Sequence, residues 1–138
     1  MEFATVCTFT DTDIHLLTEV RSILQKISEV TPSHNGYKDN PSVTALIVCK
    51  AISRVNNGLI YVEGMFCHEP HCWLKSASTG NIIDALPMCM QGPVLLSSRC
   101  KQTQQMYQPK DLRICSMHHV DIVNQVERAL LPNHNHLP

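Results

Sequence analysis

Residues 58–87, GLIYVEGMFCHEPHCWLKSASTGNIIDALP, decide the fold class of this chain. Residues 59–66 are rich in β-branched and aromatic side chains, which are typical of a strand. A second strand is expected over residues 71–77, and the sequence STGN at residues 78–81 is a hairpin signal that leads into a third strand at residues 82–84. The stretch therefore predicts an antiparallel meander.

Helical patterns flank this meander on both sides. Between residues 13 and 30 apolar side chains recur every three or four positions, which is the period of a helix with one buried face. A second helix is expected from Pro41, because proline is favoured at the first helical position. A last helix is predicted over residues 118–131. The order predicts an α+β fold, with N-terminal helices packed on a small antiparallel sheet and a C-terminal helix.

The region between the meander and the last helix has a weaker pattern. The sequence VLLSS at residues 94–98 favours a strand, whereas KQTQQMYQPKD at residues 101–111 is polar and typical of a loop. A chain of 138 residues has the usual size of one domain. We expect residues 1–131 to form that domain and residues 132–138 to be a loose polar tail.

Composition and charge argue against several classes of partner. The net charge of −1 leaves no basic surface for nucleic acid, and no apolar run approaches the roughly 20 residues that span a membrane. The first residues lack the pattern of a signal peptide, so the seven cysteines are expected to be reduced thiols in a cytoplasmic protein. The charged content of 17% is low and favours a surface covered by a protein or peptide partner; with the last helix it permits a homodimer.

His71 and Asp84 form the most informative pair of polar residues. They are thirteen residues apart, at the start of one predicted strand and at the end of the next. A hairpin with its turn at residues 78–80 would bring both to the same end of the sheet. A carboxylate bonded to one ring nitrogen of a histidine fixes the tautomer and leaves the other nitrogen to accept a proton. The spacing therefore predicts a base and its orienting group.

The same residues carry a resemblance to a known superfamily. The pattern GLIYVEG, a short loop, HCWL, a turn and IID resembles the papain-like cysteine hydrolases, above all their transglutaminase-like and phage-encoded branches. The match covers roughly residues 40–87, with Gly64 at a turn, His71 as base, Trp73 as the aromatic residue and Asp84 as orienting group. The resemblance implies a thiol hydrolase or deamidase that acts on an amide or isopeptide bond.

The nucleophile departs from that family pattern. The resemblance places a cysteine at the N-terminal end of the helix before the strands, where the helix dipole lowers the thiol pKa. That region reads GYKDNPSV here and has no cysteine. Cys49 lies about two turns into the helix and is the first candidate, Cys7 is a second, and Ser42 lies at the expected helix end but is a weak substitute without activation. The alternative is a non-catalytic interaction or inhibitor protein, as in viral or phage accessory proteins.

A zinc-stabilised binding module is the third interpretation. The sequence CHEPHC at residues 67–72 and CSMHH at residues 115–119 are two short clusters of possible zinc ligands. Zinc takes four such ligands in a tetrahedron, and two short segments often supply two each. The expectation for the domain as a whole remains that no cofactor is needed, with zinc as the alternative.

Overall fold

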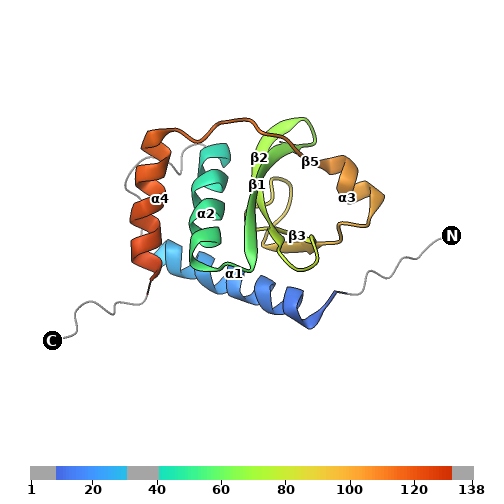
Figure 1. Ribbon diagram of the computed structural model, residues 1–138, viewed down its shortest axis with the longest axis horizontal. Helices are drawn as coiled ribbons and strands as arrows, with labels where there is room; N and C mark the ends of the chain where they lie inside the picture. The colour runs from blue at the N-terminus through green and yellow to red at the C-terminus, as the bar shows by residue number, and fades with distance from the viewer. Residues whose placement is uncertain (1–8, 31–40, 132–138) are drawn as a thin grey trace.

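The computed structural model describes residues 9–30 and 41–131 (Figure 1), and three of its helices lie where the sequence predicts them. Helix α1 covers Asp11–Val30 and helix α2 covers Pro41–Val55. A short helix α3 covers Lys101–Met106, and helix α4 covers Met117–Leu130. The Thr10 hydroxyl accepts a hydrogen bond from the Asp13 backbone N–H (3.1 Å), which caps the start of α1.

The strands form one antiparallel sheet of five strands in the order β4-β3-β2-β1-β5. Strand β1 (Leu59–Phe66) pairs along its whole length with β2 (Glu69–Ser76). Three short strands complete the sheet; these are β3 (Ile82–Asp84), β4 (Val94–Leu96) and β5 (Tyr107–Pro109).

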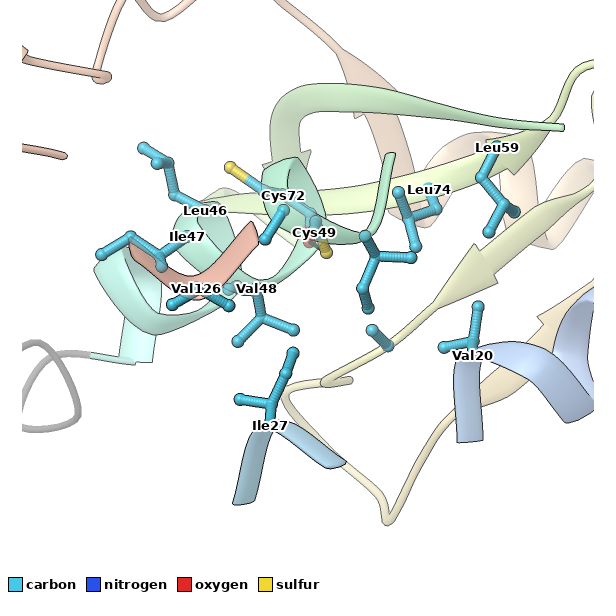
Figure 2. Packing of buried hydrophobic residues seen from close by; sticks show 14 of the residues in the cluster. Val20, Ile27, Leu46, Ile47, Val48, Cys49, Leu59, Cys72, Leu74 and Val126 are labelled. Atoms are coloured by element: carbon cyan, nitrogen blue, oxygen red, sulfur yellow. Dashed lines mark hydrogen bonds between the residues drawn. The ribbon is translucent and has the colours of Figure 1, made fainter. Parts of the chain in front are cut away.

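Helix α2 lies between α4 and one face of the sheet, and α1 crosses the end of both layers (Figure 1). This position explains the apolar sequence of α2, in which the five residues from Ala45 to Cys49 are all buried. Val126 of α4 and Cys72 and Leu74 of β2 contribute to the same core (Figure 2). A helix that is covered on opposite faces needs apolar side chains on both of them, and the apolar run in the middle of α2 supplies them.

The predicted α+β class is confirmed, with N-terminal helices, an antiparallel sheet and a C-terminal helix. The prediction of a loop at residues 101–111 was wrong, because this segment forms α3 and then β5. Its polar side chains are mostly exposed, and only Thr103 and Tyr107 are buried. Elements with so few buried positions have no apolar period for a sequence to reveal.

Gly64 lies within β1 and not at a turn or bend. It pairs with His71 on one side and with Pro109 of β5 on the other. A Cβ atom at this position would collide with the Gln108 carbonyl and would lie 2.7 Å from the Trp73 ring. The absence of a side chain at Gly64 therefore lets β5 come close to β1, the strand that pairs with β2 and its residue His71.

In the described ranges, 9–30 and 41–131, no helix is long and apolar enough to cross a membrane. The tail predicted at residues 132–138 lies outside the described residues.

Candidate functional site

The structure brings His71 and Asp84 into direct contact at one end of the sheet. The His71 Nε2 atom lies 2.9 Å from Asp84 Oδ2 and 3.1 Å from Oδ1. His71 is only 2% exposed and Asp84 is fully buried. The register of β2 and β3 pairs Leu74 with Ile83, which places Asp84 diagonally across from His71. The hydrogen bond that the sequence spacing predicts is present.

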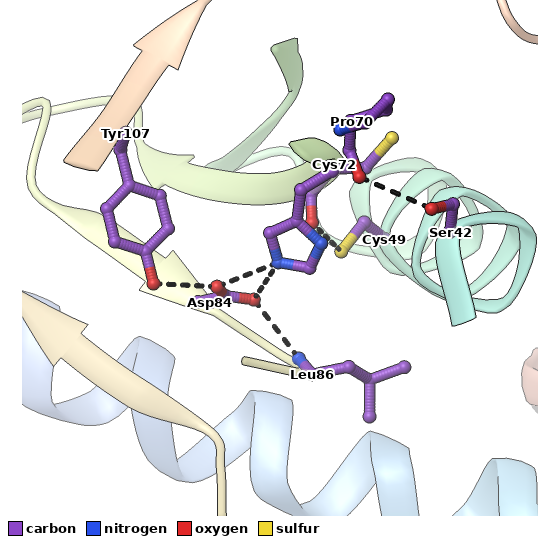
Figure 3. Close-up of polar contacts among 8 residues, drawn as sticks. Ser42, Cys49, Pro70, Cys72, Asp84, Leu86 and Tyr107 are labelled. Atoms are coloured by element: carbon purple, nitrogen blue, oxygen red, sulfur yellow. Dashed lines mark hydrogen bonds and ion pairs between the residues drawn. The ribbon is translucent and has the colours of Figure 1, made fainter. Parts of the chain in front are cut away.

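Two further donors hold the Asp84 carboxylate in place (Figure 3). The Tyr107 hydroxyl of β5 donates to Oδ2 (2.8 Å), and the Leu86 backbone N–H donates to Oδ1 (3.2 Å). Burial, and then the neighbouring Asp84 charge, raise the pKa of Tyr107 well above its usual range, so its hydroxyl stays protonated as a donor. The Asp84 carboxylate is therefore held in place by neighbours from two sides.

Two aromatic side chains lie near the imidazole of His71. Its ring centroid lies 6.0 Å from that of Phe66 and 6.1 Å from that of Trp73. Such a setting leaves little water beside the His71–Asp84 pair, and a charge-assisted hydrogen bond is stronger where water is excluded. With Asp84 on Nε2, the Nδ1 atom is the ring nitrogen left to exchange a proton with another group.

His71 also lines a pocket with a volume of about 410 Å³, which we call the His71 pocket. One wall is the N-terminal turn of α2, and another is the chain that follows β3. The described residues that line it are Pro41, Ser42, Thr44, His71, Leu86, Pro87 and Met88. Apart from the histidine none of these side chains is ionisable, so the His71 pocket is suited to an uncharged part of a ligand.

Ser42 is the hydroxyl-bearing residue at the helix end where the resemblance expects a thiol. It is half-buried, and its hydroxyl donates to the carbonyl of Pro70 (3.3 Å), the residue directly before His71 (Figure 3). The contact ties the start of α2 to the start of β2. Ser42 and His71 therefore line the same pocket, and the Ser42 side chain is bonded to the residue directly before His71.

Cys49, the first candidate nucleophile, lies in the core and does not line the His71 pocket. Its side chain is fully buried, and its Sγ atom contacts the Cys72 carbonyl at 3.7 Å (Figure 3). Burial, followed by the charge of Asp84, raises the pKa of this thiol well above its usual value. A buried and protonated thiol is a poor nucleophile, so Cys49 has the properties of a core residue.

The other cysteines offer no better thiol at this site. No cysteine is among the described residues that line the His71 pocket. Cys72 is buried and contacts the Tyr61 hydroxyl (3.2 Å), and burial is the main cause that raises its pKa to about 11. Cys67 and Cys89 are exposed. Cys7, the second candidate, lies outside the described residues.

The possible zinc ligands are not assembled into a site in the described part of the chain. No three histidine, cysteine, aspartate or glutamate side chains there are grouped so that they could hold a metal ion. His71 is paired with Asp84, and the His119 ring accepts a hydrogen bond from the Ser116 backbone N–H (3.2 Å) as part of the cap of α4. Two of the histidines in the predicted clusters are thus engaged in other contacts.

Comparisons with models of known protein families, with curated proteins and with solved structures find no match to this chain.

Sequence reasoning missed Tyr107 and the residues from Leu86 to Met88 that border the His71 pocket. Tyr107 reaches Asp84 from a strand 23 residues further along the chain. Its only local signal is an aromatic residue within a polar segment. A lone aromatic residue in such a segment does not reveal its partner.

Proposed function

We propose that this domain is a hydrolase of papain-like design that cleaves amide or ester bonds, with Ser42 in place of the family's cysteine. His71 is the general base, and Asp84 is the residue that orients it. The observation that carries the proposal is the His71 pocket, in which a histidine held by a buried carboxylate shares one cavity with a hydroxyl at a helix N-terminus.

The chemistry follows the usual steps of acyl transfer. Ser42 Oγ forms a bond to the substrate carbonyl carbon while His71 Nδ1 accepts the hydroxyl proton. The intermediate collapses as the carbon–nitrogen bond breaks, and His71 returns the proton to the leaving amine. A water molecule then cleaves the resulting ester, again with His71 as base. The positive end of the α2 dipole lies beside the carbonyl oxygen, where negative charge develops.

The test uses a fluorophosphonate probe, because it reacts with activated serines and requires no known substrate. Ser42 Oγ would attack phosphorus and fluoride would leave, which adds a stable mass to the intact chain. We expect one adduct, on Ser42, in the wild-type chain and none in Ser42→Ala. His71→Ala should slow adduct formation by roughly 10³-fold or more, because the proton acceptor is gone.

A second variant keeps the test decisive if the serine reacts slowly. Ser42→Cys places a thiol at the start of α2, where the helix dipole and His71 should lower its pKa. We expect iodoacetamide to modify position 42 at pH 6 faster than it modifies the exposed Cys89 of the same chain. If neither the fluorophosphonate nor iodoacetamide reacts preferentially at position 42, the hydrolase proposal is wrong.

A non-catalytic binding protein on the same scaffold is the second candidate. One observation favours it: the Ser42 hydroxyl donates to the Pro70 carbonyl, and this bond competes with activation by His71. Such a protein would show neither labelling reaction, and it would keep its partner after His71→Ala. The affinity for a peptide that the wild-type chain binds, measured on the wild type and on His71→Ala, distinguishes the binding protein from the hydrolase.

A further inference from the structure

A second depression next to the His71 pocket has no part in the chemistry proposed above. It has a volume of about 370 Å³ and lies between α1, α2 and the chain after β3; we call it the α1–α2 groove. Its apolar lining includes Leu24 and Ile27 of α1 and Val48 of α2. From this groove we infer the substrate class: the bond to be cleaved lies next to an uncharged apolar side chain, aliphatic or aromatic, which the groove binds. The inference rests on the proposed function.

The composition of the groove selects an apolar occupant. Among the described residues that line it none carries a charge, and the only polar side chains are Ser28 and Thr44. An ionised side chain placed there would lose water without gaining a partner, which costs several times more than an apolar group gains. Its volume lies in the lower part of the range of small-ligand sites, roughly 300–1,000 Å³. One side chain of leucine or phenylalanine size fits that description.

The groove adjoins the candidate site. Thr44 and Leu86 line both the α1–α2 groove and the His71 pocket. The Leu86 backbone N–H is bonded to Asp84, so the residue that separates the two cavities is held by the carboxylate that orients His71. A substrate whose carbonyl lies beside Ser42 can therefore place its neighbouring side chain in the adjacent groove.

The loop that borders the His71 pocket also presents apolar side chains. Met88 lines the His71 pocket and is 44% exposed, and Met90 further along the same loop is 52% exposed. Methionine side chains are flexible and adapt to apolar ligands of different shapes. Exposed apolar side chains in the loop that borders the His71 pocket are typical of a binding surface.

The experiment measures binding and cleavage separately on the full chain. Three N-acetyl amino-acid amides serve as probes, those of leucine, glutamate and lysine, and their affinities are measured from the shifts of methyl resonances in the groove. Cleavage is measured with the nitrophenyl esters of the same three acids. We expect the leucine compound to be favoured over the glutamate compound by about 10- to 100-fold in both measurements.

A charge placed in the groove should reverse part of this preference. Ser28 is exposed at the groove and is not part of the proposed chemistry, so Ser28→Glu should fold normally. We expect it to weaken leucine-amide binding by about tenfold and to favour lysine over leucine. Ser22→Glu is the matched control, since Ser22 is exposed on the same helix but does not line the groove.

The outcomes distinguish the two proposals. Binding of the leucine amide in the groove without cleavage of any ester supports the groove and contradicts the hydrolase. Cleavage with no preference among the three esters supports the hydrolase and overturns the groove. Equal affinities for the three amides, no shift of the groove methyl resonances, or equal effects of Ser22→Glu and Ser28→Glu also overturn the inference.

Discussion

Two fully buried aspartates, Asp13 and Asp84, lie in this domain and receive different partners. Asp13 accepts hydrogen bonds from the Thr79 hydroxyl (2.9 Å) and the Asn81 side-chain amide (2.8 Å). Asp84 accepts from the Tyr107 hydroxyl and from His71. Both carboxylates join elements that are distant in sequence, and both belong to the polar groups that a core tolerates only when they are bonded.

The difference lies in what the partners can do. Thr79 and Asn81 do not titrate, so the Asp13 cluster can only hold the start of α1 against the β2–β3 turn. Asn81 extends this connection by accepting from the Ser98 backbone N–H (2.9 Å) after β4. The cluster connects α1, the β2–β3 turn and the segment after β4, so we assign its contribution to stability.

The Asp84 cluster differs because it contains His71, which is an acid–base group. An imidazole can gain or lose a proton under ordinary conditions, and this imidazole lines a pocket. Burial of a carboxylate is therefore not by itself a sign of function. What indicates function here is that the partner of the buried carboxylate is a histidine, and that this histidine also lines a pocket with room for a ligand.

The largest effect that this contrast predicts concerns Asp84→Asn. An amide in place of the carboxylate should let the His71 ring adopt the wrong tautomer, with its proton on Nδ1. We expect reactivity of Ser42 toward the fluorophosphonate to fall by roughly 10³- to 10⁴-fold, as in other triads that lose their acid. The unfolding free energy should fall by less than about 2 kcal/mol, since an amide still offers hydrogen bonds to its neighbours. Rates of adduct formation and urea unfolding measure the two quantities.

Asp111→Asn is the control for this variant, because Asp111 is an exposed carboxylate that does not line the His71 pocket. It should change neither quantity. Equal loss of reactivity in both variants would mean that net charge, and not the orientation of His71, governs the reaction.

A smaller effect, on stability, is expected for Asp13→Ala. The change leaves the Thr79 hydroxyl and the Asn81 amide without their acceptor, and burying unbonded donors costs about 1–3 kcal/mol each. We expect the unfolding free energy to fall by about 3 kcal/mol, with the reactivity of Ser42 in the remaining folded protein unchanged. Chemical unfolding followed by circular dichroism gives the first value, and probe labelling at low denaturant gives the second.

Asp11→Ala is the matched control, since Asp11 lies in the first turn of the same helix but is exposed. Only its interaction with the helix dipole is lost, worth about 0.3–1 kcal/mol. Similar losses in the two variants would show that Asp13 acts through the dipole and not through Thr79 and Asn81. A loss of Ser42 reactivity in Asp13→Ala would contradict the separation of the two clusters.

Much of this arrangement could be predicted from the sequence, for a physical reason. Strands β1 and β2 and the turn after them are continuous in the chain, so alternation and turn residues report their pairing directly. The contact between His71 and Asp84 follows from one hairpin and its register. Contacts that depend on a single turn are the ones that a sequence pattern determines most directly.

Other parts required the three-dimensional structure. Tyr107 reaches Asp84 through β5, which pairs with the far side of β1 because Gly64 leaves room for it. The exclusion of Cys49 depends on α4 and the sheet, which together bury α2 on opposite faces. Neither fact has a local pattern, since both arise from elements far apart in the chain that pack together.

The smallest effect that we predict belongs to Tyr107→Phe. It removes one hydrogen bond to the Asp84 carboxylate but keeps the ring, whose centroid lies 4.8 Å from Phe66 and 5.1 Å from Trp73. Hydrogen bonds to charged groups contribute about 1.5–3 kcal/mol, so we expect a loss of unfolding free energy near the lower end.

Because Tyr107 acts on the reaction only through Asp84, the reactivity of Ser42 in Tyr107→Phe should fall by less than about tenfold, far less than in Asp84→Asn. Fluorophosphonate labelling rates of the two single variants and of the double variant measure this relation. If Tyr107 merely positions the carboxylate, it should have no effect once Asp84 is replaced. An additive loss in the double variant would instead give Tyr107 a role of its own at the reacting atoms.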